Sequence, residues 1–87
     1  MKSYVISYDL RNSRNYDDLY TALKNYPNWG HVLESVWVIK SDDSATTIRD
    51  YLKAKMDNDD GLFVVESANV AAWSHVICEN DWLRENG

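Results

Sequence analysis

The chain has 87 residues, a formal net charge of −5 and one cysteine, Cys78. Residues 1–87 are too few for two domains, and the single cysteine excludes an intrachain disulfide framework and favours a reducing compartment. The sequence shows no signal-peptide pattern and no apolar run of membrane-spanning length, so we expect a soluble cytoplasmic protein.

The charge is unevenly distributed along the chain. Residues 1–41 carry five basic and four acidic side chains, whereas residues 42–87 carry four basic and ten acidic ones. An acidic protein does not gather nucleic acid through its overall field, so any such function has to be local or metal-assisted. The acidic second part suits a basic protein partner, which it would attract by electrostatic steering.

The N-terminal part predicts a strand followed by a helix. Residues 3–10 alternate between apolar and polar side chains, which indicates a strand. Residues 11–14 are polar turn formers, Asn15 is a good N-cap, and Pro27 ends the helix because the residue before a proline avoids the α region. The helix repeats apolar and aromatic residues at helical spacing: Tyr16, Leu19, Tyr20, Leu23 and Tyr26.

The middle of the chain predicts further strands around a second helix. Residues 28–30 read as a turn, and residues 31–40 as one long strand or a tight strand pair bent between Glu34 and Val38. Either Ser44 or Asp43 caps the helix that follows. The expected buried stripe of that helix is Ala45, Ile48, Leu52 and Met56.

The last third predicts one more strand and a tail. Residues 56–61 form a turn, and residues 62–67 are a short, nearly continuous apolar strand of the kind found inside a sheet. In the tail, residues 68–87, the segment 74–78 reads as an edge strand and 79–86 as a short helix. We expect the tail to pack on the sheet or on a partner chain.

The element order predicts an α+β domain of ferredoxin-like, split βαβ type, with a core over residues 3–67. Two helices should cover one face of an antiparallel sheet and leave the other face open. A small domain cannot leave an apolar face in water, so a homodimer that covers it is the expected solution.

Short motifs support a family resemblance. Tyr8-Asp9 at the end of the first strand and Ser35-Val36-Trp37 in a later strand resemble the CRISPR-associated protein 2 superfamily, over residues 3–67. Together with Trp73 and Trp82-Leu83 in the tail, they look most like the small stand-alone SinR-like proteins. The toxin-like virulence-associated protein D is a more distant relative of the same plan.

The resemblance implies a dimer of ferredoxin-like domains and metal-dependent phosphodiester cleavage. In this group the aspartate at the end of the first strand pairs with its copy across the two-fold axis to hold a divalent ion. By that resemblance Asp9 is the catalytic residue and the ligand of Mg²⁺ or Mn²⁺. The CRISPR proteins also serve as a structural bridge in the complex that integrates spacers, where cleavage is not needed.

The residues themselves leave two interpretations of Asp9 open. Mg²⁺ prefers near-octahedral oxygen ligands, so one carboxylate is a poor site, whereas two carboxylates with phosphate oxygens are adequate. Alternatively, Asp9 ends the strand and accepts hydrogen bonds from the following turn.

A phosphate-binding group is expected next to Asp9. Arginine matches phosphate oxygens in a bidentate way, and hydroxyl and amide groups add hydrogen bonds. The candidates are Arg11, Arg14, Ser7 and Asn12. The alternative is that the two arginines balance nearby surface carboxylates, which contributes only about 0–1 kcal/mol per exposed pair.

We expect structural roles for most of the remaining histidine, cysteine and tryptophan residues. His31 and His75 have no second ligand at metal-binding spacing, and Cys78 has no basic neighbour that would lower its pKa. Trp37 should serve either core packing or a dimer contact, and Trp29 is the best candidate for an exposed aromatic side chain. Trp82 should hold the tail against the sheet or a partner.

These observations lead to two expected functions. The first is a homodimeric, divalent-metal-dependent nuclease that acts on RNA or DNA. The alternative is a non-catalytic acidic interaction module on the same fold, such as an inhibitor, an antitoxin or a scaffold.

Overall fold

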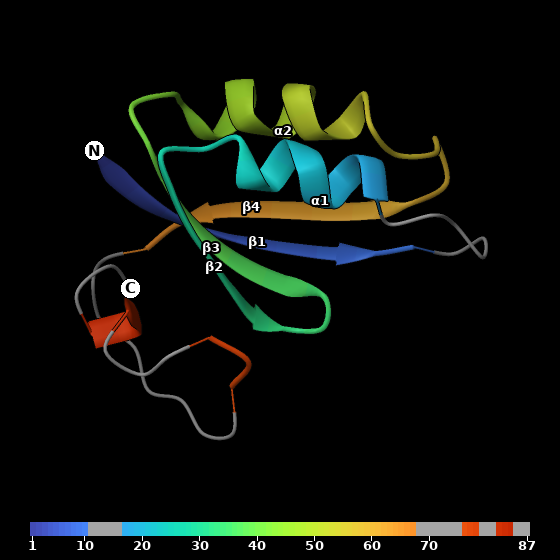
Figure 1. The fold of residues 1–87 in the computed structure, drawn as a ribbon. Helices are drawn as coiled ribbons and strands as arrows, with labels where there is room; N and C mark the ends of the chain where they lie inside the picture. The colour runs from blue at the N-terminus through green and yellow to red at the C-terminus, as the bar shows by residue number, and fades with distance from the viewer. Residues whose placement is uncertain (11–16, 68–75, 79–81, 85–87) are drawn as a thin grey trace.

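The computed structural model describes residues 1–10, 17–67, 76–78 and 82–84. They form an α+β structure around a four-stranded antiparallel sheet (Figure 1). The elements in chain order are β1 (Lys2–Asp9), α1 (Asp17–Lys24), β2 (Asn28–Leu33), β3 (Val36–Ser41), α2 (Ala45–Lys53) and β4 (Gly61–Glu66). No described helix is long and apolar enough to cross a membrane.

The sheet has the strand order β2-β3-β1-β4. β1 therefore lies between β3 and β4 and pairs with both of them in antiparallel orientation, with Ile6 opposite Trp37 on one side and Val64 on the other. β4 stands at the end of this order, so the expectation of an inner strand at residues 62–67 is wrong. A short apolar run does not by itself distinguish an inner strand from an edge strand, because both can bury one face.

Both helices cover one face of the sheet, as predicted, and the described tail residues lie on the other side (Figure 1). The alternation along β1 decides which side chains enter the core: Tyr4, Ile6 and Tyr8 are buried. The core between sheet and helices consists of Tyr4, Ile6, Tyr8, Leu19, Ala22, Leu23, Trp37, Ile39, Ile48 and Leu52.

The helix boundaries follow local signals. Ser44, one of the two predicted caps, is the N-cap of α2, and its Oγ accepts a hydrogen bond from the N–H of Thr47 at 3.1 Å. α1 stops at Lys24, before Tyr26 and Pro27, and the Tyr26 N–H donates to the Leu23 carbonyl as the last turn tightens. Asn15 and Tyr16, the predicted cap and first aromatic, lie outside the described residues.

Residues 28–41 form a strand pair with its turn at Glu34 and Ser35. The prediction of a tight pair within residues 31–40 is confirmed, with an irregular register between His31 and Leu33. The prediction of a turn at residues 28–30 is wrong, because these residues pair with residues 38–40 of β3 and extend β2. Cross-strand pairing overrides the turn preference of asparagine and glycine here.

The described tail residues pack on the chain's own sheet. Leu83 is buried against Val32 and Val38 on the face opposite α1 and α2, with Val76 and Trp82 beside them; we call this face the helix-free face because neither α1 nor α2 covers it. Residues 82–84 are helical, and the rest of the predicted tail helix over residues 79–86 lies outside the described residues. In place of the predicted edge strand, residues 76–78 make one backbone hydrogen bond to β2, from the Ile77 N–H to the Val32 carbonyl at 2.8 Å.

Candidate active site at the end of strand β1

Asp9 is the last residue of β1 and is exposed. It lies opposite Gly61, the first residue of β4. Because neighbouring side chains of a strand point to opposite faces and Tyr8 enters the core, Asp9 belongs to the helix-free face. The structure therefore confirms the prediction that Asp9 lies at the end of the first strand.

Ser7 lies on the same face as Asp9. It is half-buried and sits between Val36 of β3 and Phe63 of β4 in the register of the sheet. Two residues along a strand correspond to about 7 Å, so the Ser7 hydroxyl and the Asp9 carboxylate can both contact one phosphate group. The structure thus brings these two predicted site residues together.

The other three predicted phosphate-binding residues, Arg11, Asn12 and Arg14, lie outside the described residues. Their assignment stays a prediction from the sequence. The described part of the site therefore consists of a carboxylate and a hydroxyl on β1.

The donor set around Asp9 suits a hard cation only in part. Carboxylate and phosphate oxygens are ligands that Mg²⁺ and Mn²⁺ accept. Within residues 1–10, 17–67, 76–78 and 82–84, no three His, Cys, Asp or Glu side chains gather as a metal site. A divalent ion at Asp9 would fit if further oxygens came from a second subunit and from the substrate.

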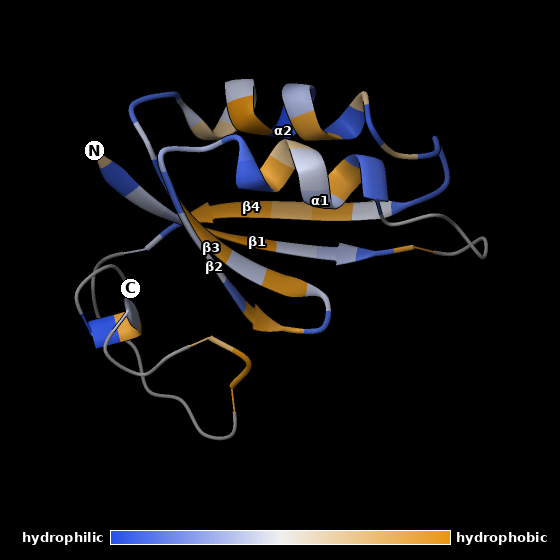
Figure 2. Cartoon of the chain, viewed as in Figure 1, coloured by the Kyte–Doolittle hydropathy of each residue, from blue (hydrophilic) through white to orange (hydrophobic). Residues whose placement is uncertain are grey.

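Two exposed apolar side chains next to this site were missed from the sequence. Phe63 is 63% exposed and Val65 is 40% exposed. Both lie on the helix-free face, opposite Ser7 and Val5 of β1. Figure 2 shows β4 as a largely apolar strand, and that composition led to its prediction as an inner strand. We call Ser7, Asp9, Phe63 and Val65 the open half of this face, and the cluster of Val32, Val38 and Leu83 the covered half.

The aromatic side chains near β2 are used in packing. Trp37 is buried in the core, the first of its two expected roles, and its Nε1 donates a hydrogen bond to the Tyr8 hydroxyl at 3.2 Å. The Tyr8 hydroxyl donates to the Glu34 carbonyl at 3.0 Å. His31 stacks on Trp37 with a centroid separation of 4.3 Å, and its Nε2 is 3.1 Å from the same carbonyl. His31 thus has a structural role, as expected, and His75 lies outside the described residues.

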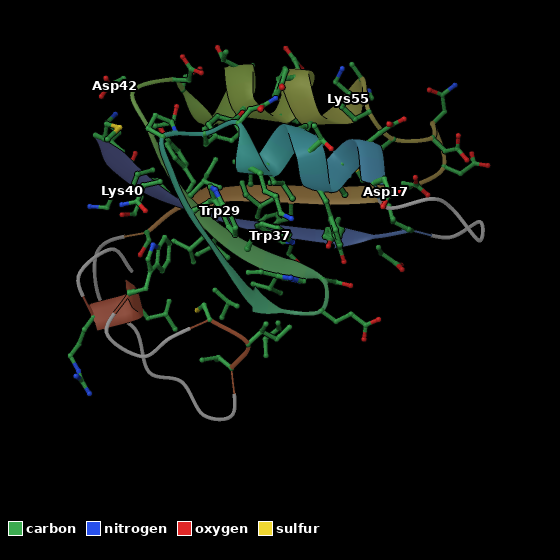
Figure 3. All side chains as sticks on the ribbon, in the orientation of Figure 1. Asp17, Trp29, Trp37, Lys40, Asp42 and Lys55 are labelled. Atoms are coloured by element: carbon green, nitrogen blue, oxygen red, sulfur yellow. The ribbon has the colours of Figure 1, made fainter. Side chains whose placement is uncertain are left out.

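Trp29 is exposed, as predicted, but its ring already has neighbours. Its centroid is 5.5 Å from that of Trp37, and the Lys24 ammonium lies 5.6 Å from its ring centre. Figure 3 shows Trp29 and Trp37 side by side beneath α1.

Cys78 behaves as a small apolar residue of the covered half. It is half-buried and packs against the cluster around Val32. Burial raises the pKa of its thiol above the ordinary value of 9.0, with a backbone hydrogen bond acting in the opposite direction. This agrees with the expectation that Cys78 is not an activated thiol.

Comparison with known proteins finds no matching family model, no matching curated protein and no matching solved structure.

Proposed function

We propose that the chain adopts the ferredoxin-like, split βαβ fold and forms a homodimer that hydrolyses phosphodiester bonds in RNA or DNA with Mg²⁺ or Mn²⁺. The element order β-α-β-β-α-β and the inner positions of β1 and β3 support the proposed fold. The resemblance in Tyr8-Asp9 and Ser35-Val36-Trp37 supports the proposed activity.

One observation carries the proposal: Asp9 is exposed on the same sheet face as the exposed side chains of Phe63 and Val65. A second copy that covers these two apolar side chains removes them from water, which is favourable by about 25 cal/mol for each Å² buried. In a two-fold dimer the same surface is used by both subunits, so each subunit would bring its own Asp9 to the edge of that contact.

The chemistry requires both subunits because one carboxylate holds Mg²⁺ poorly. When bound, the divalent ion supplies charge neutralisation at the phosphate and lowers the pKa of an attacking water. Asp9 from each subunit would hold the ion, and the Ser7 hydroxyl would donate a hydrogen bond to a phosphate oxygen. Arg11, Asn12 and Arg14 follow directly in sequence and are proposed to bind the phosphate.

The direct test is cleavage of labelled single- and double-stranded RNA and DNA by pure protein with Mg²⁺, with Mn²⁺ and with EDTA. We expect Asp9→Asn to lower the rate by at least about 10²-fold, because it removes the ligand charge. Asp59→Asn changes an exposed carboxylate of the α2–β4 connection and serves as the matched control. Cleavage that persists in the Asp9→Asn variant contradicts the nuclease proposal. So does the absence of cleavage by the unaltered protein.

The same samples separate cleavage from bridging. A scaffold that holds nucleic acid without cutting it should bind DNA at low salt, and its affinity should fall steeply as salt rises. Binding that is salt-dependent but leaves the strand intact would replace the enzyme by a scaffold on the same fold.

A second candidate function is an acidic module that binds a basic protein. It is favoured by the exposed carboxylates of Asp42, Asp43 and Asp50, at and before α2. Rim charges of this kind mainly raise association rates and depend on ionic strength. Affinity capture at low and moderate salt should yield a stoichiometric basic partner whose binding weakens with salt; a capture without such a partner contradicts this candidate.

A further inference from the structure

A cavity lies beside the start of β1, at the opposite end of that strand from Asp9. Its volume is about 460 Å³, within the usual range for small-molecule sites. It is formed where the chain leaves α1 and where it enters α2, next to the first residue of β1, and Tyr26, Asp43 and Tyr51 are among its lining residues. Figure 3 shows Asp42, which also lines it, beside the start of β1.

Two aromatic rings form part of the cavity wall. The Tyr26 and Tyr51 centroids are 6.0 Å apart and the rings are nearly perpendicular, at 87°. Asn25 Nδ2 donates a hydrogen bond to the Tyr51 hydroxyl at 3.4 Å, which helps to orient that ring. Two rings at right angles present both a π face and a second wall to a guest, which is how aromatic cages receive organic cations.

The Tyr51 ring already attracts a cation from the chain itself. The Lys55 ammonium lies 5.9 Å from its centre. Lys55 lines the neighbouring groove between α1 and α2 and does not line this cavity, whereas Tyr51 lines both. The contact with Lys55 therefore shows that the Tyr51 ring can attract a cation, and it leaves the cavity unfilled.

The charge of the lining is negative. Asp42 and Asp43 are among the lining residues; the Asp42 side chain is 86% exposed and one of its oxygens lies 3.6 Å from the Met1 ammonium, which is the cationic group among the described lining residues. The C-terminal end of α1 and the N-terminal end of α2 both meet the cavity, so their opposite partial charges largely offset one another. Asp42, Asp43 and the Met1 ammonium together therefore carry one net negative charge.

The backbone around Asp43 is fixed before any ligand binds. The Tyr4 hydroxyl donates to the Asp43 carbonyl at 2.7 Å, and the Asp43 N–H donates to Ser41 Oγ at 3.0 Å. Burial, with the charges of Asp43 and of Tyr51, raises the pKa of Tyr26 to about 12. The phenol of Tyr26 therefore stays neutral under ordinary conditions and adds no competing charge to the wall.

We propose that this cavity binds a small organic cation of the alkylammonium class, held between the rings of Tyr26 and Tyr51 and balanced by the carboxylates of Asp42 and Asp43. The aromatic pair supplies attraction for the charge and for the alkyl groups, and the carboxylates select a cation over a neutral molecule of the same shape. The site is separate from Asp9, because Met1 lines the cavity at the start of β1 and Asp9 is the last residue of that strand.

The test is an NMR titration of the labelled protein with tetramethylammonium chloride and with n-butylammonium chloride. We expect saturable shifts of the Asp43 and Thr47 amides with these salts. Tert-butanol, a neutral molecule of similar shape, and sodium chloride should not reproduce them. Nα-acetyl-lysine methylamide mimics a lysine residue within a protein. Comparing its shifts with those of n-butylammonium distinguishes a protein lysine side chain from a free amine as the natural source of the cation.

Matched variants assign the effect to the cavity. Tyr51→Leu removes the ring but keeps an apolar side chain at a position that is 39% exposed, and should weaken binding by about threefold or more. Tyr51→Phe should retain binding, Asp43→Asn should weaken it, and Asp59→Asn should not change it. Asp9→Asn should leave the titration unaltered, so failure of the nuclease proposal and failure of this one are distinguishable.

Three outcomes would overturn the cation site. These are shifts of equal size with tert-butanol, shifts of equal size with sodium chloride, and binding that is unchanged in Tyr51→Leu.

Discussion

The sheet face opposite α1 and α2 has two halves that differ in how much of their apolar surface is exposed to water. In the covered half, Val32, Val38 and Leu83 are at most 8% exposed. In the open half, Phe63 and Val65 keep 63% and 40% of their surface in water. Strand alternation puts apolar side chains on both halves, but the described tail residues pack on β2 and β3. The difference shows that the described tail residues cover one part of this sheet face and leave Phe63 and Val65 exposed.

The covered half should depend most strongly on Leu83. Leu83→Ala removes a side chain that is 4% exposed and should lower the free energy of unfolding by about 2–4 kcal/mol. Urea denaturation measures this. Ile77→Ala, at a position 59% exposed whose backbone hydrogen bond to Val32 is retained, should cost less than about 0.5 kcal/mol. Equal losses for the two variants would mean that the tail does not dock as described.

Gly30 is the contact point between β2 and the tail. A Cβ at this position would meet ring carbons of Trp82 at 2.5–2.9 Å, so the ring would have to move. The Trp82 Nε1 donates a hydrogen bond to Asn28 Oδ1 at 2.9 Å, which this movement would strain. We expect Gly30→Ala to cost about 1–3 kcal/mol in urea denaturation. In a Trp82→Ala background the same change should cost clearly less, because the two residues are in contact.

The open half should affect association instead of folding. If a second copy covers Phe63, Phe63→Lys should raise the dimer Kd at least about tenfold, or ~1.4 kcal/mol. Its effect on monomer stability should stay within about 0.5 kcal/mol because the side chain is exposed. Sedimentation equilibrium and urea denaturation measure the two effects, with Phe63→Leu as control. A protein that is monomeric at all accessible concentrations would leave the open half without its proposed occupant.

The reaction rate of the Cys78 thiol reports on the packing of the covered half, and it is the smallest of the expected effects. Burial raises the pKa of its thiol, so less thiolate is present at neutral pH and reaction with a disulfide reagent should be slower than for a free thiol. In Leu83→Ala, which loosens the tail, the rate should approach that of the free thiol.

The raised pKa of the Cys78 thiol also predicts that the stability of the folded protein depends on pH. Because the folded pKa is raised, its contribution to stability is present below the unfolded value and is lost as pH rises through the folded value. Stability should therefore decline on the alkaline side of 9.0, and Cys78→Ala should lose this component of the decline. An unchanged alkaline profile in Cys78→Ala would show that the thiol is not the group responsible.

The candidate site was predictable where it depends on β1 alone. The alternation over residues 3–10 placed Ser7 and Asp9 on one face, and the structure agrees. The exposed neighbours Phe63 and Val65 were not predicted, because their strand was assigned to the interior of the sheet. Local periodicity gives the face of a strand but not its place in the sheet, which depends on long-range pairing.

The sequence by itself determined the alternation of strands and helices apart from the division of residues 31–40, limited the cap of α2 to Ser44 or Asp43, and divided β1 into a core row and an outer row. These features depend on side chains within a few residues of one another, where propensity and periodicity act directly. Only the tertiary structure decided that residues 28–30 belong to β2, that β4 stands at the end of the order of described strands, and that Trp82 lies over Gly30. Each of these depends on contacts between residues remote in sequence, and their free energy is set by packing in three dimensions.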